Sequence, residues 1–195
     1  MDDLVLQAMQ RWPDVPSAYG WLSLDARGRW KLHPEGGANH TPPEPGEYIT
    51  NLGLNAFINR NYASDEQGRW FFQNGPQRVY VRIEAAPYII RLADDGIALQ
   101  THTGLPVEHV EEWLLDEAGH LYLRTPQGAG RIEDRDLPAL LTELKLGELT
   151  LLDALENGAQ QGLLTHPVLP SAPWRQTHGE DIPTLLGFQT GHTPS

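Results

Sequence analysis

One turn motif, Asp-x-x-Gly followed by a long or aromatic residue, recurs in the sequence and restricts the folds open to the chain. It occupies residues 25–28, 65–68 and 116–119, and residues 93–96 carry a related Ala-Asp-Asp-Gly turn. An aspartate at the first turn position can accept hydrogen bonds from the backbone, and glycine readily takes the positive φ that the fourth position requires. This chemistry is typical of a type I turn with a bulge between antiparallel strands. The motif therefore predicts a series of β-hairpins.

The first and third of these hairpins share more than the turn. Residues 21–32 align with residues 113–123 when one residue is omitted before the aspartate, and both segments open with Trp-Leu. Either a duplicated unit or repeated use of one turn solution can produce such a match. Because only three short segments match, we favour repeated use of the turn.

Helical patterns lie on both sides of the hairpins. An apolar stripe over residues 5–12 predicts a short helix, and a stripe over residues 54–62 predicts a helix that crosses the sheet. Leucines over residues 137–144 and 151–155 predict a C-terminal helical pair. The sequence thus predicts an α+β protein, in which an antiparallel β-meander forms a twisted sheet or a partly closed barrel.

The domain organisation follows from length and composition. A chain of 195 residues lies within the range of ~100–200 residues per domain, so we expect one α+β domain, over residues 1–158. Residues 159–195 are rich in Pro, Gly, Thr and His, yet contain Leu163, Trp174 and Phe188. We interpret this segment as an extended arm that lies on the domain or on a second copy of it. A homo-oligomer formed through the arm is therefore predicted.

Charge and targeting signals restrict the partners and the compartment. The net charge of −12 repels nucleic-acid phosphates and anionic lipid surfaces, so we expect neither nucleic acid nor a membrane as partner. Residues 1–6 carry acidic groups where a signal peptide requires positive charge, and no apolar run approaches the ~18 residues of a membrane span. Together with the absence of cysteine, these features predict a cytoplasmic protein.

Motifs of common enzyme classes are missing from the sequence. The chain has no cysteine, no Gly-x-Ser-x-Gly among its five serines and no Gly-Lys-Ser/Thr, which excludes a thiolate nucleophile, a nucleophile elbow and a phosphate-binding loop. His102, His109 and His120 lie near several carboxylates, a combination that can hold zinc or iron. Their spacing matches no metal motif, and we favour the interpretation that the cluster is an exposed acidic loop. We therefore predict no catalytic residue, no cofactor and no metal site.

A positively charged window stands out in this acidic chain. Residues 67–93 contain four arginines and one glutamate, a net charge of +3. Alternation along a strand places Arg78, Tyr80 and Arg82 on one face, opposite the valines between them. Arginine guanidinium groups bind carboxylates and phosphates, so we predict a candidate site for a small anionic ligand. Its members are Arg69, Arg78, Tyr80, Arg82 and Asn59.

We favour a structural explanation of this window over the anion site. Residues 101–195 hold five basic and fourteen acidic residues, a net charge of −9, and could supply partners for the arginines. We expect a non-enzymatic binding or interaction module, because no nucleophile, metal set or cofactor loop is recognised. The alternative is an enzyme or sensor of a small anionic ligand, with its site on these central strands.

Part of the chain resembles a known family. The segments AYGWLSLD (residues 18–25), FINRNY (57–62) and DEQGRWFFQNGPQRVYV (65–81) are similar to an uncharacterised proteobacterial family, a domain of unknown function. The resemblance covers approximately residues 4–136 and leaves the C-terminal segment out. It implies a bacterial cytosolic protein with no assigned activity, and it transfers no catalytic residue.

Overall fold

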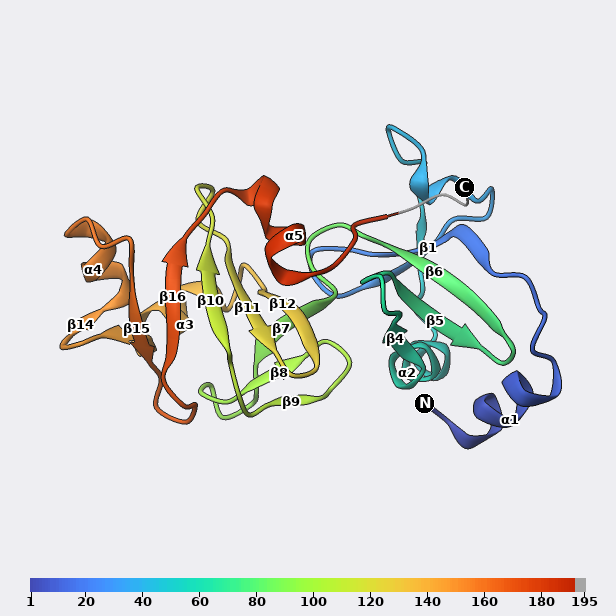
Figure 1. The fold of residues 1–195 in the computed structure, drawn as a ribbon, viewed down its shortest axis with the longest axis horizontal. Helices are drawn as coiled ribbons and strands as arrows, with labels where there is room; N and C mark the ends of the chain where they lie inside the picture. Colours follow the sequence, from blue (N-terminus) through green and yellow to red (C-terminus); the bar gives the residue numbers. More distant parts are fainter. Residues whose placement is uncertain (192–195) are drawn as a thin grey trace. The chain divides into compact units, whose positions relative to one another are not determined.

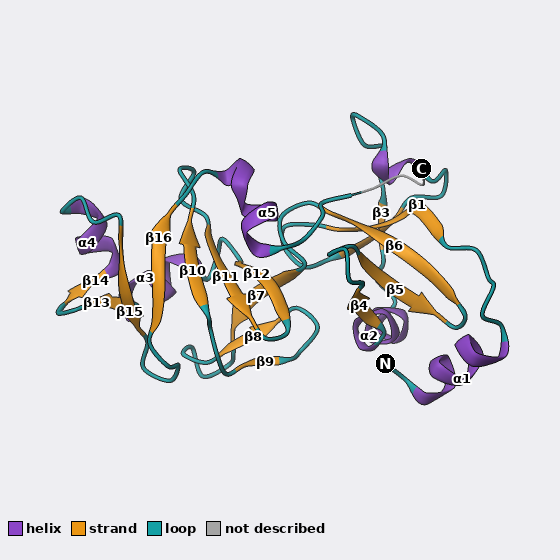
Figure 2. Cartoon of the chain, in the orientation of Figure 1, coloured by secondary structure: helices purple, strands orange, loops and turns teal. Residues whose placement is uncertain are grey.

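The computed structural model describes residues 1–191 and separates the chain into two compact units (Figure 1). Unit 1 consists of Met1–Ala85 together with the segment that begins at Phe188, and unit 2 consists of Ala86–Gly187. Strands form most of the regular structure of each unit (Figure 2). None of the helices within the described residues is both long and apolar enough to cross a membrane.

Unit 1 is built on a six-stranded sheet. Its strands are β1 (Ala18–Leu24), β2 (Trp30–Leu32), β3 (Glu47–Tyr48), β4 (Tyr62–Ser64), β5 (Trp70–Asn74) and β6 (Gln77–Ile83). Its helices are α1 (Asp3–Arg11), α2 (Leu52–Arg60) and the 3-10 helix η1 (Gly37–Asn39). The strand order is β3-β2-β1-β6-β5-β4, in which β1 and β6 are parallel and the other pairs are antiparallel.

Helix α2 lies on one face of this sheet, as its apolar stripe predicts. The helix begins where the Asn51 side chain accepts a hydrogen bond from the Leu54 amide, at 2.9 Å. Ile58 is buried, and Phe57 contacts Phe72 of β5 edge-to-face at 5.5 Å between ring centroids. The helix thus covers the sheet face formed by β5 and its neighbours.

Unit 2 contains a ten-stranded sheet. Its strands are β7 (Tyr88–Leu92), β8 (Leu99–Thr101), β9 (Pro106–Val107), β10 (Glu112–Leu115), β11 (Leu121–Thr125), β12 (Gly128–Ile132), β13 (Lys145–Leu146), β14 (Leu149–Thr150), β15 (Gln161–Thr165) and β16 (Ala172–Gln176). Its helices are α3 (Leu137–Glu143), α4 (Leu151–Glu156), α5 (Ile182–Leu186) and the 3-10 helix η2 (Gly179–Asp181). The order is β14-β13-β15-β16-β10-β11-β12-β7-β8-β9, and the pairs β7–β12 and β10–β16 are parallel.

The predicted α+β class is confirmed, but the purely antiparallel meander is wrong, because both sheets are mixed. The reason is physical: turn chemistry determines only the strands that a turn joins. The parallel pairs join strands far apart in sequence, and their pairing depends on which apolar faces are buried together. No local motif carries that information.

Six consecutive strands follow the same order in each sheet. The order β3-β2-β1-β6-β5-β4 of unit 1 corresponds to β9-β8-β7-β12-β11-β10 of unit 2, with the first strand of each set parallel to the sixth. By this correspondence the β1–β2 hairpin matches β7–β8, and β4–β5 matches β10–β11. The segments matched in sequence, residues 21–32 and 113–123, form the hairpins β1–β2 and β10–β11. These two hairpins occupy different positions in the shared strand order.

The segment predicted as an arm is divided between the units. Residues 159–187 contribute β15, β16, η2 and α5 to unit 2, where Trp174 is buried and pairs in register with Trp113 of β10. Of the Pro and Gly residues that suggested an arm over 159–195, Pro167 and Pro170 lie between β15 and β16, whereas Gly162 and Pro173 lie within these strands. Residues 188–191 belong to unit 1, where the Gln189 amide donates to the Gly68 carbonyl at 2.9 Å. Self-association through residues 159–195 stays a prediction.

The Asp-x-x-Gly segments form turns whose aspartates fasten neighbouring strands. In the β4–β5 turn the Gly68 amide donates to the Asp65 carbonyl at 3.0 Å, with Gly68 at φ +73°. One carboxylate oxygen of Asp65 accepts from the backbone amides of Gln67 and Arg69, and the other accepts from the Arg69 side chain at 2.7 Å and the Tyr80 hydroxyl at 3.1 Å. Asp65 thus joins the turn to β6.

We expect Asp65→Ala to lower the free energy of unfolding by about 2–3 kcal/mol, because a buried tyrosine, a guanidinium and two amides lose their shared acceptor. Glu66→Ala is the matched control, since it removes an equal charge from an exposed position in the same turn. Urea unfolding followed by tryptophan fluorescence measures both variants. Equal losses in the two variants would contradict the anchoring role.

Candidate functional site

The structure brings only two of the predicted site residues together. Arg69 contacts Tyr80, with 3.2 Å between the guanidinium and the phenol hydroxyl, and both groups bind Asp65. Tyr80 is buried and stacks on Tyr19 at 4.9 Å between ring centroids. Asn59 lies elsewhere, on α2, where its side-chain oxygen accepts from the Trp30 indole at 2.8 Å. The Arg69–Tyr80 pair therefore ties β6 to the Asp65 turn.

Arg78 and Arg82 share a face of β6 with Tyr80 but do not converge. The Arg78 guanidinium lies 4.5 Å from the Phe71 ring centroid, whereas Arg82 donates to the Ala38 carbonyl at 3.0 Å. Positions four apart on a strand are separated by about 13 Å. Within residues 1–191, neither arginine lies within 4.0 Å of a carboxylate, so the expected pairing with the acidic C-terminal half is not seen for these two.

A buried serine–histidine pair in unit 1 was not singled out from the sequence. The Ser23 hydroxyl lies 2.8 Å from Nε2 of His33, and Nδ1 of His33 lies 3.1 Å from the Glu44 carbonyl oxygen. Because a carbonyl can only accept, Nδ1 donates, and Nε2 accepts from the Ser23 hydroxyl. Such a pair can activate a nucleophile, but Ser23 is only 1% exposed. The pair therefore has a structural role, and burial lowers the pKa of His33.

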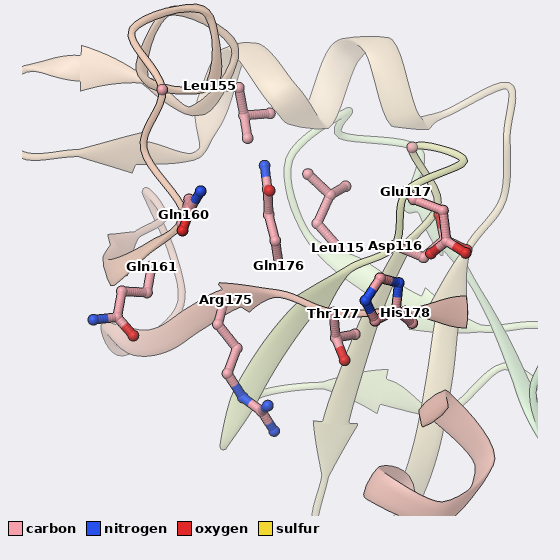
Figure 3. A pocket seen from close by; sticks show the side chains of 12 residues that line it. Leu115, Asp116, Glu117, Leu155, Gln160, Gln161, Arg175, Gln176, Thr177 and His178 are labelled. Carbon is pink, nitrogen blue, oxygen red and sulfur yellow. The ribbon is translucent and has the colours of Figure 1, made fainter. Parts of the chain in front are cut away.

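A cavity of about 1040 Å³ lies in unit 2, and we call it the unit 2 groove (Figure 3). It is formed where the parallel strands β10 and β16 end and where β15 begins. Its lining comes from the ends of these strands, the turn after β10 and the segment after α4. The lining residues are Leu115, Asp116, Glu117, Gly119, Leu155, Gly158, Gln160, Gln161, Arg175, Gln176, Thr177 and His178.

Strand register explains why these side chains meet. Leu115 of β10 pairs with Gln176 of β16, and Arg175 of β16 pairs with Gln161 of β15. The backbone amide of Gln176 donates to the backbone carbonyl of Gln160 at 2.8 Å, which continues the hydrogen-bond ladder beyond β15. Because parallel strands end at the same edge of a sheet, the turns that follow β10 and β16 open side by side.

The charged groups of the unit 2 groove have partners within the unit. Asp116 accepts from His120 Nδ1 at 2.8 Å and from the His120 amide at 2.7 Å. Glu117 accepts from the Gly179 amide at 2.7 Å, and backbone hydrogen bonds hold the pKa of its carboxyl below the usual value. Arg175 donates to Glu112 at 2.9 Å. These charges therefore fix the walls of the groove.

The glutamine side chains of the groove differ from its charged groups. In the part of the chain that the structure describes, the side-chain amides of Gln160, Gln161 and Gln176 make no hydrogen bond to the protein. Figure 3 shows the side-chain amide of Gln176 extending toward Leu155, on the other side of β16 from Arg175. The groove thus combines neutral donors and acceptors with a small apolar surface.

Sequence reasoning missed these glutamines because they lie in the segment interpreted as an arm. The available signal was a group of polar residues, Gln160-Gln161 and Gln176-Thr177-His178, at the ends of two short apolar runs. The histidines considered for a metal site are separated: His120 binds Asp116, whereas His102 accepts from the Ile89 amide at 3.2 Å.

Comparison with known proteins identifies the family. A family model described as "Protein of unknown function (DUF2946)" matches residues 1–193. The chain belongs to this family, DUF2944. The resemblance to an uncharacterised family is thereby confirmed, and the family match includes the C-terminal segment that the resemblance left out.

Two solved structures are similar to the chain. A DUF1285 family protein from Silicibacter pomeroyi DSS-3 is 14% identical, with 76% of this chain and 87% of that chain covered and a TM-score of 0.49. A DUF1285 family protein from Shewanella baltica OS155 is 15% identical, with 60% and 86% covered and a TM-score of 0.41. No curated protein matches the chain.

The buried pair in unit 1 predicts a pH-dependent stability. Because the folded state lowers the pKa of His33 below the ordinary value of about 6.5, the unfolded chain binds more protons near pH 6. The free energy of unfolding is therefore highest above pH 6.5 and decreases as the pH falls toward 5. Substitution His33→Gln should reduce this slope, in urea unfolding measured at a series of pH values.

Burial also lowers the pKa of His166, in unit 2, so a residual slope remains in the His33 variant. Gln127→Ala, which removes an exposed side chain without a titratable group, is the control and should keep the slope of the wild-type protein. A His33→Gln slope equal to that of wild type would show that His33 is not the titrating group.

Proposed function

We propose that the protein is a non-enzymatic interaction module, whose unit 2 groove binds a neutral, polar polypeptide segment of a partner. The observation behind it is that three glutamines lining the groove, Gln160, Gln161 and Gln176, have side-chain amides that make no hydrogen bond to any protein group within residues 1–191. Each amide both donates and accepts hydrogen bonds, as a peptide backbone does. A cytoplasmic location is part of the same proposal, and the cysteine-free sequence supports it.

Size and charge support a peptide over a small charged molecule. The volume of about 1040 Å³ lies at the upper limit of the ~300–1,000 Å³ usual for small-ligand pockets. A charged ligand would have to compete with the contacts of Asp116, Glu117 and Arg175 inside the unit. A neutral segment leaves those contacts intact and hydrogen-bonds to the glutamines instead.

A binding role also agrees with the state of the acid and base groups. Both carboxylate oxygens of Asp116 are occupied by His120, and Glu117 holds the backbone of Gly179 at the start of η2. Carboxylates whose oxygens already accept hydrogen bonds within the protein hold the backbone in position rather than transfer protons. The apolar surface of Leu115 and Leu155 provides a contact for one small side chain of the bound segment.

The proposal is tested with uncharged Ser/Gly/Asn dodecapeptides as probes and with the full chain in solution. In ¹H–¹⁵N spectra, the peptides should shift the side-chain amide signals of the three groove glutamines. The double substitution Gln161→Ala with Gln176→Ala should weaken binding about tenfold or more, which corresponds to at least 1.4 kcal/mol. Gln127→Ala, at an exposed turn of unit 2 outside the groove, is the control and should leave affinity unchanged. Absence of shifts, or equal affinities, would contradict the proposal.

A second candidate function is the binding of a small anion by unit 1, as the sequence predicts. It is favoured by one observation: within the described residues, Arg78 and Arg82 have no carboxylate within 4.0 Å. Their separation along β6 means that two anions, or one extended anion, would be bound.

This second candidate has its own test. Inorganic phosphate and citrate should raise the melting temperature of the wild-type protein, and Arg78→Ala combined with Arg82→Ala should abolish the increase. The variant Arg11→Ala, which removes an exposed arginine of α1, should respond like wild type. Indifference of the wild-type protein to both anions would eliminate this candidate.

A further inference from the structure

Unit 1 contains a cavity that neither candidate function uses. This cavity, called the unit 1 pocket, has a volume of about 420 Å³, which falls within the ~300–1,000 Å³ of small-molecule sites. The sheet contributes Leu22, Leu32, Phe72 and Val79 to its walls, and α2 contributes Leu54 and Ile58. The pocket lies on the sheet face that α2 covers, opposite to the face that carries Tyr80.

The pocket exists because α2 is too short to cover the whole apolar face. The helix has nine residues and buries Ile58 fully, whereas Leu54, nearer its beginning, is 43% exposed. Leu32 and Trp21, which also line the pocket, are 44% and 46% exposed. Large apolar side chains gathered around a concavity are typical of binding sites rather than of ordinary surface.

The chemistry of the lining restricts the ligand. Among the described residues that line the pocket none is charged, so a buried ionic group would lose its hydration without gaining a counter-charge. Two amide side chains, Asn74 and Gln77, provide the polar contacts. The Gln77 nitrogen donates to the Pro16 carbonyl at 3.1 Å, which holds the side chain in place and leaves its oxygen as an acceptor.

We propose that the unit 1 pocket binds a neutral small molecule with an apolar body and one hydrogen-bonding end, of the class of medium-chain alcohols. The apolar body contacts the aliphatic walls and Phe72, and the polar end donates to the amide oxygen of Gln77 or Asn74. The site is independent of the unit 2 groove, since it shares no residue with it.

The test uses N-phenyl-1-naphthylamine, a neutral probe whose fluorescence rises in apolar surroundings, with the full chain. We expect a saturable rise that 1-decanol reverses and decanoate reverses at least tenfold less effectively, because decanoate carries a charge. Leu54→Arg places a charge in the pocket and should weaken probe binding at least tenfold.

Leu52→Arg is the matched control. It adds the same charge to the same helix at a residue that is 83% exposed and does not line the pocket, so probe binding should remain unchanged. Leu32→Arg, on β2, is a second pocket variant and should act like Leu54→Arg, while circular dichroism and melting temperature verify that each variant is folded.

Four results would overturn the proposal. The first is the absence of saturable probe fluorescence, and the second is equal affinity of the Leu52 and Leu54 variants. The third is a dimer, seen by light scattering, that Leu54→Arg abolishes while the probe fails to bind, which would identify a second copy of the chain as the occupant. Displacement by decanoate as effective as that by decanol would exclude a neutral ligand class.

Discussion

Unit 1 depends on the parallel pairing of β1 with β6. Leu22 lies opposite Val81 and Leu24 opposite Ile83, and all four side chains are buried. Because β1 is joined to β2 by one turn and β6 to β5 by another, this pairing unites two hairpins into one sheet. It also gives β6 a neighbouring strand on each side, β1 and β5. One face of β6 contacts the Asp65 turn, and the other face lies toward α2. The β7–β12 pair has the same role in unit 2.

The sequence predicted what depends on neighbouring residues. The turns at Asp65 and Asp116 form because one aspartate and one glycine contain all the chemistry that the turn needs, and α2 begins at its Asn51 cap. Alternation also placed Arg78, Tyr80 and Arg82 correctly on one face of a strand. It could not show that Tyr80 is buried under Tyr19, because that contact joins segments distant in sequence.

The parts that could not be predicted share one property, namely that they depend on long-range pairing. Residues 161–165 and 172–176 form two short strands, and the pairing of β16 with β10 shows that Trp174 belongs in a core. The glutamines of the unit 2 groove are uncharged and belong to no sequence motif. Their place in a common groove becomes visible only when three separate chain segments meet. Charge was the most visible signal in the sequence, and the structure uses much of that charge internally, as in the Asp65–Arg69 and Asp116–His120 pairs.

The return of the chain to unit 1 after residue 187 affects how the protein is made. The Gln189 amide binds the Gly68 carbonyl and the Thr190 carbonyl binds the Ile83 amide, with Phe188 buried beside them. A ribosome releases these residues only after all of unit 2 has been synthesised. During synthesis the Ile83 amide of unit 1 therefore lacks its Thr190 partner, and the segment that supplies this partner is made about a hundred residues after the rest of the unit. Completion of the first-made unit thus depends on the last-made segment of the described chain.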